Sequence, residues 1–310
     1  MHLFFDEIKD EDLKYCIEHA YDEKFDTTEI APLVKTDKAY YLELFHGATI
    51  AFKDMALQIL PHLLTVSMKK TKEDKEVVIL VATSGDTGKA ALEGYKDIDK
   101  IKIMVYYPED GVSKVQKLQM TTQTGNNVNV CAIKGNFDDA QSGVKKIFSD
   151  KNIASLLNDG GVFLSSANSI NWGRLVPQIT YYFSAYADLL ASGEIEEGEE
   201  INFCVPSGNF GNILAGYYAK RMGLPVHKLI CASNKNNVLT DFINGGTYSV
   251  NREFYKTTSP SMDILISSNL ERLVYELSNR DSKLTAERML ELKSKGKYSI
   301  TKNEKEELDK

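Results

Sequence analysis

The chain has 310 residues, of which 43% are hydrophobic and 26% charged, and its formal net charge is −7. This length suits two lobes better than one small domain, and the composition is that of a globular protein with a sizeable core. The acidic balance, with a pI of about 5.4, argues against a nucleic-acid partner, which would need a basic face. A small anionic substrate is compatible with it, because backbone dipoles bind anions whatever the net charge.

The sequence shows neither a targeting signal nor a membrane segment. Asp6 and Glu7 come early, and no basic region followed by an apolar core resembles a signal peptide. No apolar run approaches the length that spans a bilayer. We therefore expect a cytoplasmic protein with no membrane partner.

The four cysteines are too far apart to form a C-x-x-C pair: Cys16, Cys131, Cys204 and Cys231. Three of them lie in apolar stretches that are predicted strands. Because free cysteine is among the most buried residue types, we expect buried, reduced thiols and no metal site.

In chain order, the sequence predicts a helix and then alternating strands and helices. The first helix covers residues 54–68 and is interrupted by Pro61. Short β-branched or aromatic runs predict strands over residues 77–82, 101–107, 128–133, 162–165, 201–205 and 228–232. Amphipathic patterns between them predict helices over residues 86–95, 113–121, 137–149, 174–190 and 212–222. This alternation indicates βαβ units, and hence an α/β fold with open, mostly parallel sheets and helices on both faces.

Two further segments complete the pattern. Residues 191–200 are rich in Gly, Ser and Glu and predict an exposed turn. The charged tail after Arg280 predicts helix, and Thr301 with Glu304 has the spacing of a capping box. Because that box opens a helix that stops at Lys310, we expect the sequence to be a fragment of a longer protein.

The first chemically informative segment is residues 45–54, FHGATIAFKD, in which Lys53 follows an apolar stretch and opens a helix. A lysine that emerges from an apolar turn is partly desolvated. Desolvation disfavours the ammonium form and makes the free amine needed for Schiff-base chemistry easier to reach. A surface lysine in the first turn of a helix would fit the same position, so position alone leaves both interpretations open.

The second segment, ATSGDTGK at residues 82–89, follows a predicted strand and opens a helix. Its glycines and hydroxyls allow donors to converge on an anion at the helix N-terminus. It is not a nucleotide phosphate loop, because that spacing would need glycine at Thr83 and a hydroxyl at Ala90. A carboxylate or phosphate of a small molecule fits the segment, and so does a capped turn with no ligand.

The third and fourth segments also lie where predicted strands end. In PSGNFGN, residues 206–212, Gly208 and Gly211 let the backbone approach a bound group. A phosphate monoester fits this segment better than a dinucleotide, because G-x-G-x-x-G is absent, and a tight turn with no ligand is the alternative. In SSANSINWGR, residues 165–174, small polar residues precede Arg174, whose planar fork matches phosphate geometry. An arginine on a solvated helix face is the alternative for that segment.

Together the segments offer one lysine in an apolar setting and three anion-binding turns, all at or beside the C-terminal ends of predicted strands. Ligands of open α/β sheets bind at that edge. One turn for a cofactor phosphate, one for a substrate carboxylate and one for a substrate phosphate would make a coherent site.

The order and spacing of FHGATIAFKD, ATSGDTGKAA, SSANSINWGR and PSGNFGN resemble threonine synthase, a fold-type-II pyridoxal-phosphate enzyme similar to tryptophan synthase β. The resemblance runs from about Ala31 to Lys310. It implies a two-lobed fold and pyridoxal 5'-phosphate as cofactor. It also implies a carbon–oxygen lyase of threonine biosynthesis that converts O-phosphohomoserine and water into threonine and phosphate.

The resemblance also implies a role for each site residue. Lys53 matches the lysine that forms the Schiff base and moves protons at Cα and Cβ. The cofactor phosphate would be held by Ser207, Gly208, Asn209, Phe210, Gly211 and Asn212. The cofactor ring and the substrate carboxylate would face Thr83, Ser84, Asp86 and Thr87. The substrate phosphate would be held by Asn168, Ser169 and Arg174.

The same resemblance divides the chain into three segments. Residues 1–53 would begin the large lobe, residues 54–165 would form the smaller lobe, and residues 166–310 would form the cofactor-binding large lobe, incomplete at its C-terminal end. The absent C-terminal piece would supply the group beside the pyridine nitrogen. A chain without it is expected to bind cofactor weakly and to expose apolar surface. The oligomeric state implied is a monomer or a homodimer.

Two other interpretations stay open. One is a different lyase of the same cofactor class, such as a serine or threonine dehydratase. Arg174 with Asn168 argues against it, because a dehydratase substrate has no phosphate to hold. The other is a truncated chain that binds the cofactor without activity or acts as an interaction module.

Overall fold

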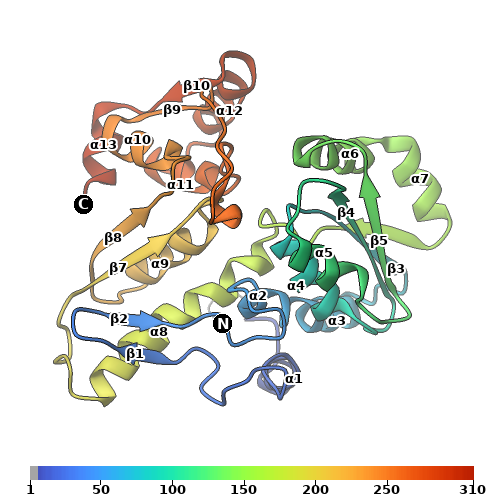
Figure 1. Ribbon diagram of the computed structural model, residues 1–310, viewed down its shortest axis with the longest axis horizontal. Helices are drawn as coiled ribbons and strands as arrows, with labels where there is room; N and C mark the ends of the chain where they lie inside the picture. The colour runs from blue at the N-terminus through green and yellow to red at the C-terminus, as the bar shows by residue number, and fades with distance from the viewer. Residues whose placement is uncertain (1–5) are drawn as a thin grey trace. The chain divides into compact units, whose positions relative to one another are not determined.

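The computed structural model describes residues 6–310, which form two compact units that meet in sequence at Asp188 and Leu189 (Figure 1). The first unit holds a four-stranded sheet and a small hairpin, and the second holds a pair of two-stranded sheets. The expected division into three segments at residues 53 and 165 stays a prediction. No helix in the described part of the chain is both long and apolar enough to cross a membrane.

The sheet of the first unit is parallel throughout, in the order β5-β4-β3-β6. Its strands are β3 (Glu76–Ala82), β4 (Ile101–Pro108), β5 (Val128–Ile133) and β6 (Val162–Ser165). All four were predicted from the sequence to within one residue. The register pairs Ile79 of β3 with Ile103 of β4 and Ser165 of β6, so the carboxyl ends of the strands share one edge.

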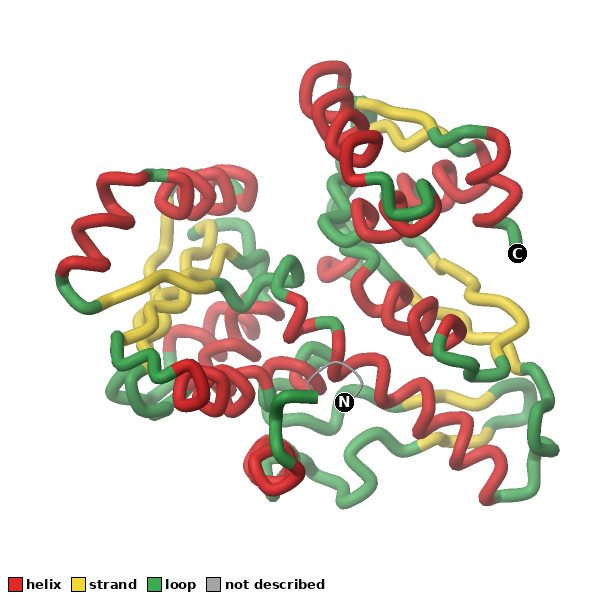
Figure 2. Tube along the Cα trace, turned by 180° about the vertical axis from the view of Figure 1, so that it is seen from behind, coloured by secondary structure: helices red, strands yellow, loops and turns green. Residues whose placement is uncertain are grey.

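Helices cover both faces of this sheet, as Figure 2 shows for the strands drawn between helices. The helices α3 (Leu60–Thr71), α4 (Asp86–Tyr95) and α5 (Lys114–Thr121) pack on one face, and α6 (Phe137–Ser149) packs on the other. Successive strand residues point to opposite faces. Ile79 therefore joins the core with α4, whereas Leu80 joins the core with α6. The predicted α/β fold with a parallel sheet is confirmed.

The helix predicted over residues 54–68 is two helices, and its end was wrong. The short α2 (Asp54–Leu57) is followed by α3, which has Pro61 in its first turn and continues to Thr71. Proline has no N–H and clashes with the carbonyl four residues earlier, so it fits only the first turn of a helix. The proline therefore begins a new helix rather than interrupting one.

The first unit also contains two further helices, a hairpin and most of the helix α8 (Val176–Ala191). The helix α1 (Asp10–Ala20) packs on α3, and α7 (Lys151–Asp159) leads into β6. The strands β1 (Leu33–Lys35) and β2 (Tyr40–Leu42) form an antiparallel hairpin. The helix α8 follows a short 3-10 turn, Trp172–Arg174.

The second unit contains the remaining elements. The parallel pair β7 (Ile201–Pro206) and β8 (Val226–Ala232) is connected through α9 (Gly211–Arg221). An antiparallel pair is formed by β9 (Thr247–Ser249) and β10 (Lys297–Ser299). The other elements are the helices α10 (Val238–Gly245), α11 (Leu270–Leu277), α12 (Ser282–Lys295) and α13 (Lys302–Leu308).

The predicted capping box at the start of α13 is confirmed. The hydroxyl of Thr301 accepts from the Glu304 amide, and the Glu304 carboxylate accepts from the Thr301 amide. The same carboxylate receives two hydrogen bonds from Arg288 of α12, of 2.8 and 2.6 Å, and both side chains are buried. A forked pair of this kind locks α12 to α13.

The expectation of buried thiols was wrong for two cysteines. Cys16 is buried, but Cys131 and Cys204 are exposed and Cys231 is partly exposed. Cys131 lies on β5, an edge strand of its sheet, and Cys204 lies on β7, where every second residue is exposed. An apolar strand sequence does not reveal which face of the strand another element covers.

Candidate active site

Lys53 lies at the start of α2, and the fold buries it. Its side chain is 10% exposed, and its amine nitrogen lies 3.6 Å from Oδ2 of Asp86 and 4.5 Å from the ring centroid of Phe52. Burial lowers the pKa of Lys53 to about 8. Asp86 opposes this shift, whereas the positive charges of Arg174 and Lys89 add to it.

The turn before Lys53 is fixed by a buried carboxylate. Asp54 accepts hydrogen bonds from the amide of Thr49 at 2.9 Å and from its hydroxyl at 2.8 Å, and Gln58 also donates to it. A side chain at Gly47 would meet Asp54 at 2.6 Å, so only glycine fits there. These contacts set where the backbone of Lys53 begins its helix.

Asp86, the first residue of α4, interacts with Gln116, Lys89 and Lys53. Gln116 donates to its Oδ1 at 2.9 Å, Lys89 lies 3.3 Å from the same oxygen, and Lys53 approaches Oδ2. Burial alone would raise the pKa of Asp86, but Lys53, Gln116 and Lys89 outweigh it and lower the pKa. The carboxylate therefore stays ionised between two lysines.

Thr83 forms the turn that carries Asp86. Its hydroxyl oxygen accepts from the amides of Gly85 and Gly88, both at 2.9 Å, and the residue is 1% exposed. Gly85 has a φ of 138°, a conformation that glycine adopts without strain. The oxygen of Thr83 is thus occupied by the backbone.

Arg174 is a buried cation with an unsatisfied atom. It is 3% exposed, and its Nη1 donates to the carbonyl of Ala167 at 2.7 Å. Its Nε is buried with no partner among residues 6–310. Burial lowers the pKa of Arg174 to about 10, an effect that Tyr95 opposes. A buried donor is normally satisfied, so this nitrogen can take an acceptor from a bound molecule or a water.

The other residues predicted for this unit differ in exposure. Asn168 donates from Nδ2 to the carbonyl of Ala82 at 3.0 Å and so links the ends of β6 and β3. Ser84 is exposed, whereas Thr87 and Ser169 are half-buried. All of them lie at the carboxyl edge of the sheet, where the sequence placed them.

The predicted phosphate turn, residues 206–212, lies between β7 and α9 in the second unit. The hydroxyl of Ser207 donates to Oδ1 of Asn212 at 2.6 Å, and Nδ2 of Asn212 donates to the carbonyl of Pro206 at 2.8 Å. Phe210 is 5% exposed and has a φ of 66°. The left-handed region costs a non-glycine residue about 1–2 kcal/mol, a strain that clusters at ligand-binding turns.

The sequence did not identify two residues that the structure brings to Asp86. Lys89 is three positions after Asp86 in a predicted helix, a spacing that puts the two side chains on one face. That signal was available. Gln116 is a capping-box residue of α5, and its reach to Asp86 depends on how α5 packs against α4.

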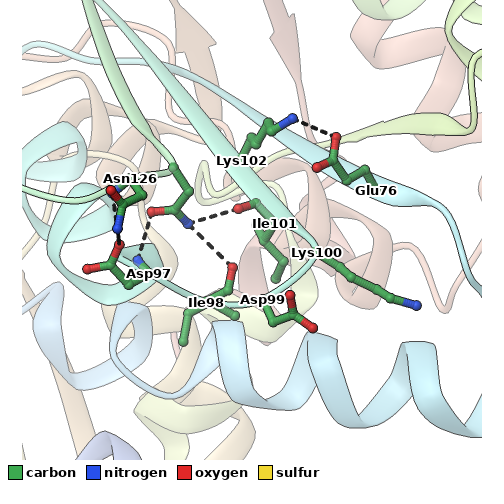
Figure 3. Close-up of a pocket in the computed structure, with 9 residues that line it drawn as sticks. Glu76, Asp97, Ile98, Asp99, Lys100, Ile101, Lys102 and Asn126 are labelled. Carbon is green, nitrogen blue, oxygen red and sulfur yellow. Dashed lines mark hydrogen bonds and ion pairs between the residues drawn. The ribbon is translucent and has the colours of Figure 1, made fainter.

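A shallow pocket elsewhere in the first unit is not part of this site (Figure 3). It is lined by Glu76, Ile101 and the loops around Asp97 and Asn127. Glu76 and Ile101 are the first residues of β3 and β4, so the pocket lies at the amino edge of the sheet. Ligands of open α/β sheets bind at the opposite edge.

Comparisons with known proteins agree with the geometry. A family model described as pyridoxal-phosphate dependent enzyme matches residues 27–293. Threonine synthase from Pseudomonas aeruginosa is 45% identical over 294 residues, which are 94% of this chain and 60% of that protein. Threonine synthase-like 1 from Homo sapiens is 45% identical over 294 residues, which are 92% of this chain and 39% of that protein. The crystal structure of threonine synthase from Brucella melitensis, with its cofactor bound, is 41% identical with a TM-score of 0.86, covering 96% of this chain and 62% of that one.

The chain thus spans 39% to 60% of the length of these two relatives. The family match includes all four segments, from residue 45 to residue 212. The resemblance to threonine synthases and the fold-type-II architecture are confirmed. On this evidence, the chain belongs to the family of pyridoxal-phosphate dependent enzymes.

Proposed function

We propose that this chain carries the catalytic machinery of a threonine synthase. The reaction is the conversion of O-phospho-L-homoserine and water into L-threonine and phosphate. The observation that carries the proposal is the group formed by Lys53, Asp86 and Arg174: a buried amine of lowered pKa, its carboxylate partner, and a buried guanidinium with an unsatisfied nitrogen.

The residues present fit pyridoxal phosphate. An amine whose pKa is about 8 can react with an aldehyde near neutral pH, because a useful fraction is unprotonated. A turn of consecutive backbone amides at a helix N-terminus suits a phosphate monoester. When bound, the cofactor supplies the electron sink that stabilises negative charge at the substrate carbon.

Lys53 is proposed to move protons at Cα and Cβ of the substrate. Its Nζ is poised for this because it can both accept and release a proton near pH 8. Asp86 would hold Nζ in place and keep a negative charge beside it. Thr83 would hold the backbone of the turn in place, since its hydroxyl oxygen already accepts hydrogen bonds from two amides.

Arg174 is proposed to hold the phosphate of the substrate. Its buried Nε is a donor without an acceptor, and a phosphate oxygen would satisfy it. A serine or threonine dehydratase would have no anion for this position. The guanidinium therefore favours a phosphorylated substrate over a plain hydroxy amino acid.

The test measures threonine and phosphate released by the purified chain from O-phospho-L-homoserine in the presence of pyridoxal phosphate. Equal amounts of the two products are expected, with no ammonia or keto acid. Lys53→Ala should abolish both products. Ammonia released from L-threonine or L-serine at a comparable rate would instead identify a dehydratase.

A further inference from the structure

Residues 267–269 donate hydrogen bonds to the backbone of the phosphate turn. The hydroxyl of Ser267 donates to the carbonyl of Gly208 at 2.5 Å. The amide and the side-chain Nδ2 of Asn269 both donate to the carbonyl of Asn209, each at 3.1 Å. Ser267 is 6% exposed and Asn269 is fully buried. Two consecutive carbonyls of the turn are thereby tied to one segment.

Tying the carbonyls also aims the amides. The C=O and N–H of one planar trans peptide unit point in opposite directions. The amide of Asn209 belongs to the unit whose carbonyl Ser267 holds, and the amide of Phe210 belongs to the unit whose carbonyl Asn269 holds. Both amides therefore face away from residues 267–269. Within residues 6–310, neither amide has a hydrogen-bond acceptor.

The backbone conformation of Phe210 brings its amide and the following amide, that of Gly211, together. Phe210 is left-handed, with a φ of 66°, and Gly211 opens the right-handed helix α9. A left-handed residue followed by a right-handed one turns successive N–H groups toward one point and makes an anion-binding concavity. The side chain of Phe210 is buried, which anchors the turn from its other end.

Ser267 is in turn held by a buried tyrosine in the core of the second unit. The amide of Ser267 donates to the hydroxyl of Tyr248 at 2.8 Å, and that hydroxyl donates to the carbonyl of Leu265 at 2.7 Å. Tyr248 is 1% exposed and packs against the rings of Phe242 and Tyr298. Ser267 therefore connects a rigid aromatic cluster to the phosphate turn.

We propose that Ser267 and Asn269 are positioning residues for phosphate binding. They hold the amides of Asn209 and Phe210 in the direction that a phosphate monoester requires, so that binding need not reorder the turn. The proposal depends on the proposed function for the identity of that monoester, pyridoxal phosphate. The orientation of the amides rests on the contacts of Gly208 and Asn209 and does not depend on that function.

The test compares Ser267→Ala, Ser267→Thr and the neighbouring Ser268→Ala in the full chain. Ser268 is exposed and serves as the matched control. The affinities for pyridoxal phosphate and for pyridoxal, which lacks the phosphate, are measured by absorbance. Losing one well-placed hydrogen bond should weaken pyridoxal phosphate binding about five- to tenfold and leave pyridoxal unchanged. Ser267→Thr keeps the hydroxyl and should restore the parent affinity, and the control should match the parent.

A purely structural role would give a different result. Equal losses for pyridoxal phosphate and pyridoxal, or no loss with either, would overturn the proposal. Asn269→Ala is measured alongside, and if it does not fold, the Ser267 pair decides the question. The backbone NMR signals of Asn209 and Phe210 during titration with inorganic phosphate give a readout that needs no cofactor. Signals that shift in the parent but not in Ser267→Ala support the role of Ser267. A Lys53 that binds no aldehyde would contradict the proposed function and leave this result in place.

Discussion

The amine of Lys53 lies 3.6 Å from the carboxylate of Asp86, and yet its pKa is lowered to about 8. An opposite charge at this distance should raise the pKa of a lysine, so desolvation outweighs the attraction. At pH 7 about a tenth of such amines are unprotonated, against fewer than about one in a thousand for an ordinary lysine. The fold makes Lys53 reactive by burying it, and Asp86 limits how far the shift goes.

Lys53 should be the residue that carries the cofactor. We expect borohydride reduction of the chain with pyridoxal phosphate, followed by peptide mapping, to place the pyridoxyl group on Lys53. Lys89, also buried beside Asp86, is the internal control, because its side chain approaches the same carboxylate. A label found mainly on Lys89 would reassign the reactive amine.

Removing Lys89 should make Lys53 less reactive at neutral pH. The charged groups facing Lys53 are Asp86, Arg174 and Lys89, and the two cations lower its pKa. Lys89→Met removes one like charge, so the midpoint for acetylation of Lys53, followed by mass spectrometry across pH, should move upward from about 8.

Two variants control this titration. Arg174→Met should move the midpoint in the same direction and further, because Arg174 has the larger influence. Lys96→Met, just beyond the end of α4, should leave it in place. An unchanged or lower midpoint in Lys89→Met would show that the two lysines are not coupled through charge.

The buried amine should cost the protein stability. Because the folded pKa of Lys53 is lowered to about 8, folding is penalised while the lysine is protonated, and the penalty is relieved as pH rises from about 8 toward the unfolded value of about 10.4. Lys53→Met should therefore raise the urea midpoint at pH 7, by a free energy of the order of 3 kcal/mol. The gain should shrink toward pH 10. If the urea midpoint of Lys53→Met equals that of the parent at both pH 7 and pH 10, Lys53 is not desolvated as its burial indicates.

Arg174 should discriminate between phosphorylated and plain substrates. Arg174→Ala should weaken O-phospho-L-homoserine binding roughly ten- to a hundredfold, the range for a charge-assisted forked contact, and should weaken cofactor binding only through the higher pKa of Lys53. Arg174→Lys keeps the charge without the planar fork and should recover only part of the affinity. The constants come from spectral titration of the loaded protein, and parent-like binding by Arg174→Ala would exclude the role.

The Arg288–Glu304 pair should dominate the stability of the C-terminal helices. Arg288→Met leaves the buried Glu304 carboxylate without its fork and should destabilise the protein by about 3–5 kcal/mol. The double change to Met at 288 and Leu at 304 should lose much less, because no buried charge remains. Denaturant unfolding of both variants measures this, and a double variant as unstable as the single one would contradict it.

The same pair gives a pH dependence. The pKa of Glu304 is lowered: burial would raise it, but bonds from Arg288 and Thr301 outweigh that effect. Its stabilisation is therefore complete above the unfolded pKa and is lost as pH falls through the lower folded pKa. Arg288→Met should flatten this part of the acid-unfolding curve.

The sequence predicted most of the fold of the first unit and only part of the site. The strand β4 was recognisable because its run of β-branched and aromatic residues is a local pattern in the sequence. Contacts such as Ser267 with Gly208 join residues 59 positions apart, and no local pattern encodes them. The same limit explains the wrong expectation for Cys131, because burial depends on which neighbour covers a strand.

Cys131 in the first unit and Cys204 in the second are exposed, so each unit has a thiol that a reagent can label. Cys16 is buried, and burial raises its pKa and that of Cys231 to about 11, so both should resist alkylation near neutral pH. A thiol-reactive donor and acceptor dye should attach to Cys131 and Cys204 without any engineered cysteine. Energy transfer between the dyes then measures whether the distance between these two cysteines changes when pyridoxal phosphate and substrate are added.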